Sequence, residues 1–191
     1  MLDIAPRIVS DKGDCRIQNL QAINGSNSAM PDESSKETAA AYHEAGHAVG
    51  AFFLGVPFGE IALDSADSGE GLVHSRLTIK QIRESKLCWQ YAVVLMLGRE
   101  AERLVFGRAD RSYLQEDARN IAGLYLTFFA SEMNCQRFRA ELRNRTAEVV
   151  GRPGFREAIE ALARVVSVQR VVPGSRAAEV IRLVTDTHSS Q

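Results

Sequence analysis

The chain has 191 residues, a hydrophobic content of 45% and a formal net charge of −1 at pH 7. This length and composition predict one soluble globular domain with a real hydrophobic core. The small net charge argues against a nucleic-acid partner and against a role at a membrane surface. The longest apolar runs, Tyr91–Leu97 and Ile121–Ala130, are far shorter than the roughly 18 residues that a membrane span needs.

The N-terminal part of the chain is polar and rich in loop signals. Residues 1–33 include the run Asn24–Ser28 and the pair Pro31-Asp32, so we expect a flexible arm followed by a single domain over residues 34–187. No basic region followed by an apolar stretch opens the chain, so no signal peptide is predicted. The three cysteines are scattered and form no CxxC pair, so we expect reduced thiols and a cytoplasmic location.

The segment after the arm predicts a helix over about residues 35–54. Ser34, with Glu37 three residues later, has the spacing of a capping box, and the alanine-rich run that follows favours a helix. Gly55 and Pro57 supply a stop signal. The predicted helix is nearly apolar apart from three polar side chains near its middle.

Those three side chains belong to the pentapeptide His43-Glu44-Ala45-Gly46-His47. Histidines four residues apart lie on one face of a helix, so both rings can reach a single metal ion. The pattern is HExxH, in which two imidazoles bind Zn²⁺ and the glutamate is the general base of a metalloprotease. We therefore expect His43 and His47 to be metal ligands and Glu44 to be the catalytic base. Gly46 is unfavourable in mid-helix by about 1 kcal/mol relative to Ala, so either another element approaches closely there or nothing selects against the glycine.

The rest of the chain predicts a small β element and further helices. Glu60–Leu63 and Gly71–Leu77 are predicted as strands, joined by the loop Asp64–Gly71. The predicted helical regions then run from a cap at Thr78 to Phe106-Gly107 and over about residues 113–129, 134–150, 155–168 and 175–185. The expected fold class is mainly α (α+β), with the HExxH helix and a small two- or three-stranded β element.

A zinc site needs more than two histidines, because a catalytic site usually takes three protein ligands and leaves a fourth position for water. Of the other histidines, His188 lies in a polar tail and His74 on a predicted strand, and neither is a good candidate. A downstream carboxylate is the better source. Spacing alone does not choose among the four candidates Glu100, Glu102, Glu116 and Asp117.

Three segments resemble the peptidase domain of the FtsH-type ATP-dependent zinc proteases. Residues 41–50, AYHEAGHAVG, are very similar to the family's AYHEAGHA stretch. Residues 97–107, LGREAERLVFG, resemble its GGRAAEELVFG segment, and Gln115–Arg119 falls where the family has an Asn-Asp pair that opens a helix. The resemblance covers about residues 38–130.

The resemblance implies a complete site and an activity. It implies that Asp117 is the third zinc ligand beside His43 and His47, and that Glu44 is the base. It also places Glu102 at an acidic position of the family, where it is either a partner of the site or a surface residue. The expected enzyme is a zinc-dependent metalloendopeptidase that hydrolyses peptide bonds of unfolded polypeptides.

Two departures from the family affect the expected partners. The chain has no GxxxxGK[ST] phosphate loop, and it lacks the family's membrane spans. We therefore expect it to cut only unfolded or loosely folded chains, or to borrow a separate ATPase that unfolds its substrates. Because FtsH-type relatives form hexamers, the resemblance also implies a homo-oligomer, which nothing in the residues demonstrates. The segment Arg108–Leu114 replaces the family's Ser/Thr-Gly-rich stretch before Asp117.

An alternative function belongs to another class. The chain can be interpreted as a non-catalytic zinc-binding adaptor or regulator of a separate ATP-dependent protease, although an adaptor has no need of Glu44. A third interpretation is a helical protein in which the HExxH pattern is accidental, and it predicts no stoichiometric metal.

Overall fold

The computed structural model describes residues 33–63, 71–75, 78–84, 86–109 and 114–188. All of the described residues belong to one compact unit, Pro31–Gln191. The predicted N-terminal arm and the loop predicted between the two strands lie almost wholly outside the described residues, so both stay predictions.

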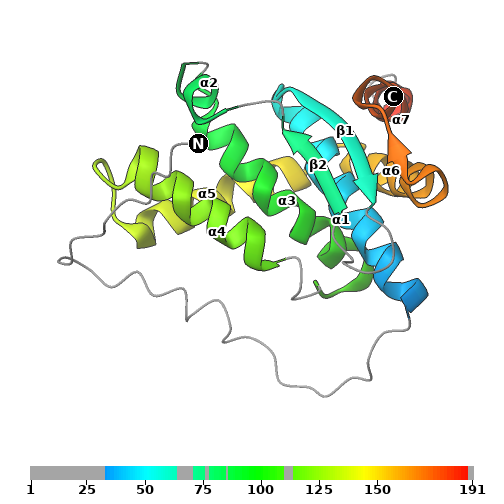
Figure 1. The fold of residues 1–191 in the computed structure, drawn as a ribbon, viewed down its shortest axis with the longest axis horizontal. Helices are drawn as coiled ribbons and strands as arrows, with labels where there is room; N and C mark the ends of the chain where they lie inside the picture. Colours follow the sequence, from blue (N-terminus) through cyan, green and yellow to red (C-terminus); the bar gives the residue numbers. More distant parts are fainter. Residues whose placement is uncertain (1–32, 64–70, 76–77, 85, 110–113, 189–191) are drawn as a thin grey trace, which may run out of the picture. The chain divides into compact units, whose positions relative to one another are not determined.

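The described part of the chain is mainly helical, which confirms the expected fold class (Figure 1). The helices are α1 (Glu33–Leu54), α2 (Ile79–Glu84), α3 (Cys88–Phe106), α4 (Leu114–Leu124), α5 (Cys135–Val150), α6 (Phe155–Gln169) and α7 (Gly174–His188). The end of α4 continues into a π-helical turn, η2 (Tyr125–Phe129). The predicted helices are present with ends that differ by a few residues, and the stretch predicted from Thr78 is divided into α2 and α3.

Local sequence signals account for several helix ends. Thr78 and Gln81 form a capping box at α2, because the backbone N–H of Gln81 donates to Thr78 Oγ1 (3.3 Å) and that of Thr78 donates to Gln81 Oε1 (2.8 Å). At the start of α5, the Asn134 side chain accepts a hydrogen bond from the N–H of Arg137 at 2.9 Å. Gly107 ends α3 in the left-handed region with φ of 70°.

A three-stranded antiparallel sheet lies against the helices. Its order is β2-β1-β3, with β1 (Phe58–Leu63) between β2 (Gly71–Ser75) and β3 (Val171–Val172). Ile61 of β1 pairs with Val73 on one side and with Val172 on the other. The two residues of β3 were not predicted as a strand, because so short a segment has no apolar alternation to detect.

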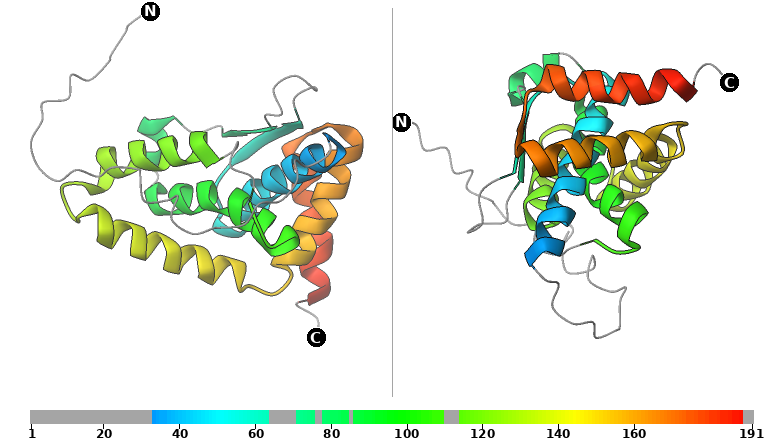
Figure 2. Two further views of the ribbon diagram at one scale, coloured as in Figure 1. Left: turned by 90° about the horizontal axis from the view of Figure 1, so that it is seen from below. Right: turned by 90° about the vertical axis from the view of Figure 1, so that its right-hand side faces the viewer.

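Helix α1 is the central element of the described fold. It contacts α3, α6 and α7 as well as β1 and β2 (Figures 1 and 2). Ala41, Ala45, Ala48 and Val49 are fully buried. Residues 43–51 are all buried, and burial around the whole circumference explains why this part of the helix is mostly apolar rather than amphipathic. Any polar side chain in its middle is therefore held away from water and needs a partner.

Close approach between α1 and α3 explains the glycine in the middle of the motif. A Cβ atom at Gly46 would meet the main-chain oxygen of Leu97 and would lie 2.6 Å from Ala101 Cβ. A side chain at Gly46 would thus force the two helices apart. Of the two interpretations of Gly46, close approach of another element is the correct one.

Two further expectations can be compared with the described residues. No helix among them combines the length and the apolar character needed to cross a bilayer. Cys88 has a free thiol, as expected, whereas Cys135 is disulfide-bonded, so the expectation of a reduced thiol is wrong at Cys135.

Candidate metal centre

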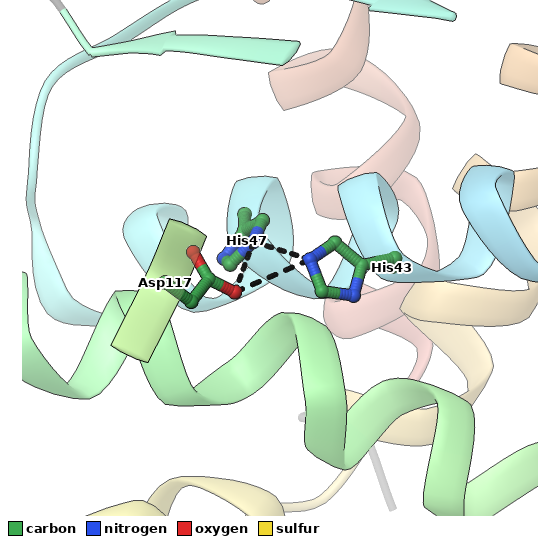
Figure 3. Close-up of side chains that lie close together, drawn as sticks. All are labelled: His43, His47 and Asp117. Atoms are coloured by element: carbon green, nitrogen blue, oxygen red, sulfur yellow. Dashed lines mark hydrogen bonds and ion pairs between the residues drawn. The ribbon is translucent and has the colours of Figure 1, made fainter. Parts of the chain in front are cut away.

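The HExxH residues lie in the buried middle of α1. His43 and Glu44 are each 3% exposed and His47 is 7% exposed. All three share one face, because His47 follows Glu44 by three residues and His43 by four on a helix. Helix α4 brings Asp117 to the same place, with a side chain that is 15% exposed, and Figure 3 shows this carboxylate facing both imidazoles.

Three potential ligand atoms converge on one point (Figure 3). The Nε2 atoms of His43 and His47 are 3.0 Å apart, and Asp117 Oδ2 is 3.3 Å from the first and 3.4 Å from the second. In a tetrahedral site with metal–ligand bonds of about 2.0–2.1 Å, two ligand atoms lie about 3.3 Å from each other. The triangle formed by the three atoms therefore has the size that one metal ion requires, and the group could hold a metal ion.

Hydrogen bonds on the far side of each ring determine which nitrogen is available. His47 Nδ1 lies 2.8 Å from the carbonyl oxygen of Val94, which can only accept, so Nδ1 carries the proton. His43 Nδ1 donates to Glu102 Oε1 at 2.6 Å. In the neutral rings both Nε2 atoms are then lone-pair acceptors that face each other, and they require a proton or a metal ion between them.

The carboxylate of Asp117 lies 3.3 Å from His43 Nε2 and 3.4 Å from His47 Nε2, but it forms no hydrogen bond with either ring. Within the described structure its Oδ2 atom is buried and accepts no hydrogen bond. A buried carboxylate oxygen is normally paired, hydrogen-bonded or bound to a metal. The atom without a hydrogen bond is the one that faces the two imidazoles, so the residues present fit a metal ion.

Electrostatics within the cluster favour the charged forms. Burial lowers the pKa of His43, but the neighbouring carboxylates of Asp117, Glu102 and Glu44 outweigh burial and raise this pKa to about 10. Burial also lowers the pKa of His47, and the negative charge of Asp117 reverses the effect, so that this pKa is raised as well. Burial raises the pKa of Asp117, but the two imidazoles hold it well below its usual range. The metal-free cluster thus retains protons that a metal ion has to displace.

The structure separates the four candidate carboxylates that spacing left open. Only Asp117 meets both Nε2 atoms. Glu102 is 1% exposed and holds His43 through its other nitrogen. Glu100 forms an ion pair with Arg103 at 3.5 Å, and Glu116 is exposed. The side chains of His74 and His188 lie outside the described part of the structure.

Sequence reasoning missed two contributors to the cluster. The carbonyl group of Val94 orients His47, and a main-chain group carries no signal in the sequence. Gly98 of α3 lies directly against both imidazoles. A glycine in the interior of a predicted helix was the available signal, because such a residue usually has a packing or functional reason.

Comparisons with known proteins neither support nor contradict this interpretation. No protein-family model matches the chain, and no curated protein matches it. The FtsH-type resemblance stays a prediction, and the case for the metal centre depends on the geometry of its residues.

Proposed function

We propose that the chain is a zinc-dependent metalloendopeptidase that hydrolyses peptide bonds in unfolded polypeptides. The observation that carries the proposal is the convergence of His43 Nε2, His47 Nε2 and Asp117 Oδ2 on one point. Two imidazoles and one carboxylate are a ligand set that zinc accepts, and three protein ligands are typical of catalytic rather than structural zinc sites. Glu44 shares the helical face of the two histidines.

The residues of the chain have separate tasks in this reaction. When bound, zinc supplies a Lewis acid that polarises a carbonyl group and lowers the pKa of a water molecule to about 7. Glu44 accepts a proton from the attacking water and delivers it to the leaving amine, so that the peptide bond breaks into a carboxylic acid and an amine. Glu102 and the Val94 carbonyl keep the two rings in the tautomer with a free Nε2 lone pair.

An extended polypeptide is the substrate that suits the sheet. β2 is an edge strand of the sheet and contacts α1, the helix that carries the motif. The main-chain groups of an edge strand can pair with an added strand. A segment that is packed inside a folded protein is not free to pair in this way, so such substrates would first have to be unfolded by a separate ATPase.

One observation favours the alternative of a non-catalytic zinc-binding adaptor. Glu44 is only 3% exposed, and a general base has to reach the water that it deprotonates. The adaptor function predicts bound zinc with no cleavage of any unfolded substrate. The endopeptidase function predicts bound zinc together with cleavage of such a substrate.

The test replaces Glu44 and compares zinc content with proteolysis. E44Q should keep its zinc and lose cleavage of an unfolded casein-type substrate, because the amide cannot take a proton from water. E100Q is the matched control, since Glu100 is on α3 and pairs with Arg103 instead. If E44Q cleaves as well as the native protein, Glu44 is not the base. If native protein with one bound zinc cleaves nothing, the adaptor is correct.

A second variant tests the third ligand. D117N should bind zinc more weakly, because the carboxylate that faces both imidazoles becomes a neutral amide. The neighbouring change E116Q removes an exposed charge from the same turn of α4 and should leave the zinc content unchanged. Equal zinc in D117N and in the native protein would remove Asp117 from the ligand set.

A further inference from the structure

The main chain of α3 lies directly against the metal-binding side of both imidazoles. A Cβ atom at Gly98 would lie 2.5 Å from His47 Nε2, 2.7 Å from His47 Cε1 and 2.8 Å from His43 Nε2. Carbon atoms do not approach other heavy atoms this closely without a shift of one or the other. The smallest side chain would therefore displace the two nitrogens that are offered to the metal.

The three glycines of α1 and α4 differ from Gly98 in what surrounds them. A Cβ at Gly46 would meet main-chain atoms of α3, and one at Gly50 would meet the side chain of Leu97. At Gly123, in α4, a Cβ would meet nothing within 4 Å. Among these four glycines, only Gly98 has imidazole atoms as the three nearest neighbours of its missing side chain, namely the two Nε2 nitrogens and one ring carbon.

We propose that Gly98 is a positioning residue of the metal centre. The backbone of α3 at this point packs directly against the two Nε2 atoms, and glycine is the only residue that lets both rings converge on one ion with the backbone this close. Main-chain atoms then close the centre on the α3 side, so a polypeptide substrate has to approach from a side that α3 does not cover.

This inference depends on the proposed metal centre but not on peptidase activity, and its test therefore measures zinc. G98A should lower the zinc affinity by about 10–100-fold, because both ligand rings have to move. In the metal-free protein G98A should lower the unfolding temperature less than G46A does, because imidazole rings can rotate away from an added methyl group whereas the main-chain carbonyl of Leu97 cannot. G123A is the matched control and should leave zinc affinity unchanged, since its methyl group has open space.

G98A should therefore lose much zinc affinity while the metal-free protein loses less stability than G46A does. A merely structural role of Gly98 would not produce this combination. A competition titration with a chromophoric chelator gives the zinc affinity, and thermal unfolding in EDTA gives the stability of the metal-free form. The absorption spectrum of the cobalt-loaded protein reports the ligand geometry separately. Zinc affinity of G98A within threefold of the native value would overturn the proposal.

A double-mutant cycle covers the case in which G98A folds poorly. His47 makes the closest contacts with the added methyl group, so H47A should relieve most of the clash. The loss of unfolding temperature caused by G98A should be smaller in the H47A background than in the native one. Equal losses in both backgrounds would show that the methyl group does not act through the imidazole, and would also overturn the proposal.

Discussion

Replacement of Glu102 by glutamine should weaken zinc binding, because Glu102 accepts a hydrogen bond from the predicted metal ligand His43. His43 Nδ1 and Glu102 Oε1 are 2.6 Å apart, and the two residues are 3% and 1% exposed. E102Q keeps the size of the side chain and one oxygen acceptor but removes the negative charge. The change therefore tests whether a carboxylate, rather than a space-filling group, supports the metal ligand.

The magnitude follows from the kind of bond that is exchanged. A hydrogen bond to a charged group contributes about 1.5–3 kcal/mol and a neutral one about 0.5–1.5 kcal/mol, so E102Q should lose about 1–1.5 kcal/mol. This loss corresponds to about a five- to twelvefold weaker zinc affinity, near the lower end of the 10–100-fold effect usual for groups that orient a metal ligand. E102A also leaves a buried N–H unpaired, at a further cost of about 1–3 kcal/mol.

The assay is a competition titration of zinc against a chromophoric chelator, with thermal unfolding to show that the variants are folded. E100Q is the control, because Glu100 lies two residues away on α3 and pairs with Arg103. The affinities should fall in the order native and E100Q, then E102Q, then E102A. If E102Q binds zinc within twofold of the native protein, or if E100Q loses as much as E102Q, the account of the His43–Glu102 pair is incorrect.

Three further predictions concern protons, α4 and the core. Zinc binding should release protons and weaken as the pH is lowered from about 10 towards 6.5, because the pKa of His43 in the metal-free protein is raised from 6.5 to about 10 and its Nε2 must lose its proton to bind. Calorimetry in buffers of different ionisation enthalpy measures the proton release. A zinc affinity independent of pH would contradict the prediction. Removal of zinc should speed amide hydrogen exchange in α4 but not in α6, because Leu124 is the one buried side chain described in α4 and Asp117 joins that helix to α1. Unchanged protection of α4 in EDTA would show that this helix docks without the metal. F138A should lower the free energy of unfolding by about 3–5 kcal/mol without changing zinc affinity, since Phe138 is 2% exposed and stacks on Trp89 with ring centroids 5.3 Å apart. Urea unfolding measures the loss, and a loss below about 1 kcal/mol would refute the packing argument.

The helices could be predicted because their signals are local. The alanine-rich run and the Gly55 stop describe α1, and Thr78 caps α2 as expected, with Gln81 completing the capping box. β3 could not be predicted, because Val171 and Val172 become a strand only by pairing with β1, more than a hundred residues earlier in the chain. Strand pairing of this kind depends on tertiary contacts that neither periodicity nor propensity records.

In the metal cluster, too, local signals predict some residues and tertiary packing determines the others. His43 and His47 are one turn apart on a single helix, so their meeting follows from helical geometry. Asp117 comes from another helix, and spacing could not distinguish it from Glu116 beside it; the family resemblance chose Asp117, and the structure brings that residue to the two Nε2 atoms. Which of two adjacent acids points inward depends on the rotation of α4 against α3, and this rotation is a result of packing.

The two imidazoles differ in how readily substitution can alter them. A side chain steadies one ring, so exchange of that residue can tune how strongly the ring donates to a bound ion. The peptide carbonyl of Val94 steadies the other ring, and every residue type carries an identical carbonyl group. Substitution of Glu102 can therefore change the environment of His43. The orientation of His47 stays the same for any residue type at position 94, as long as the backbone keeps its conformation.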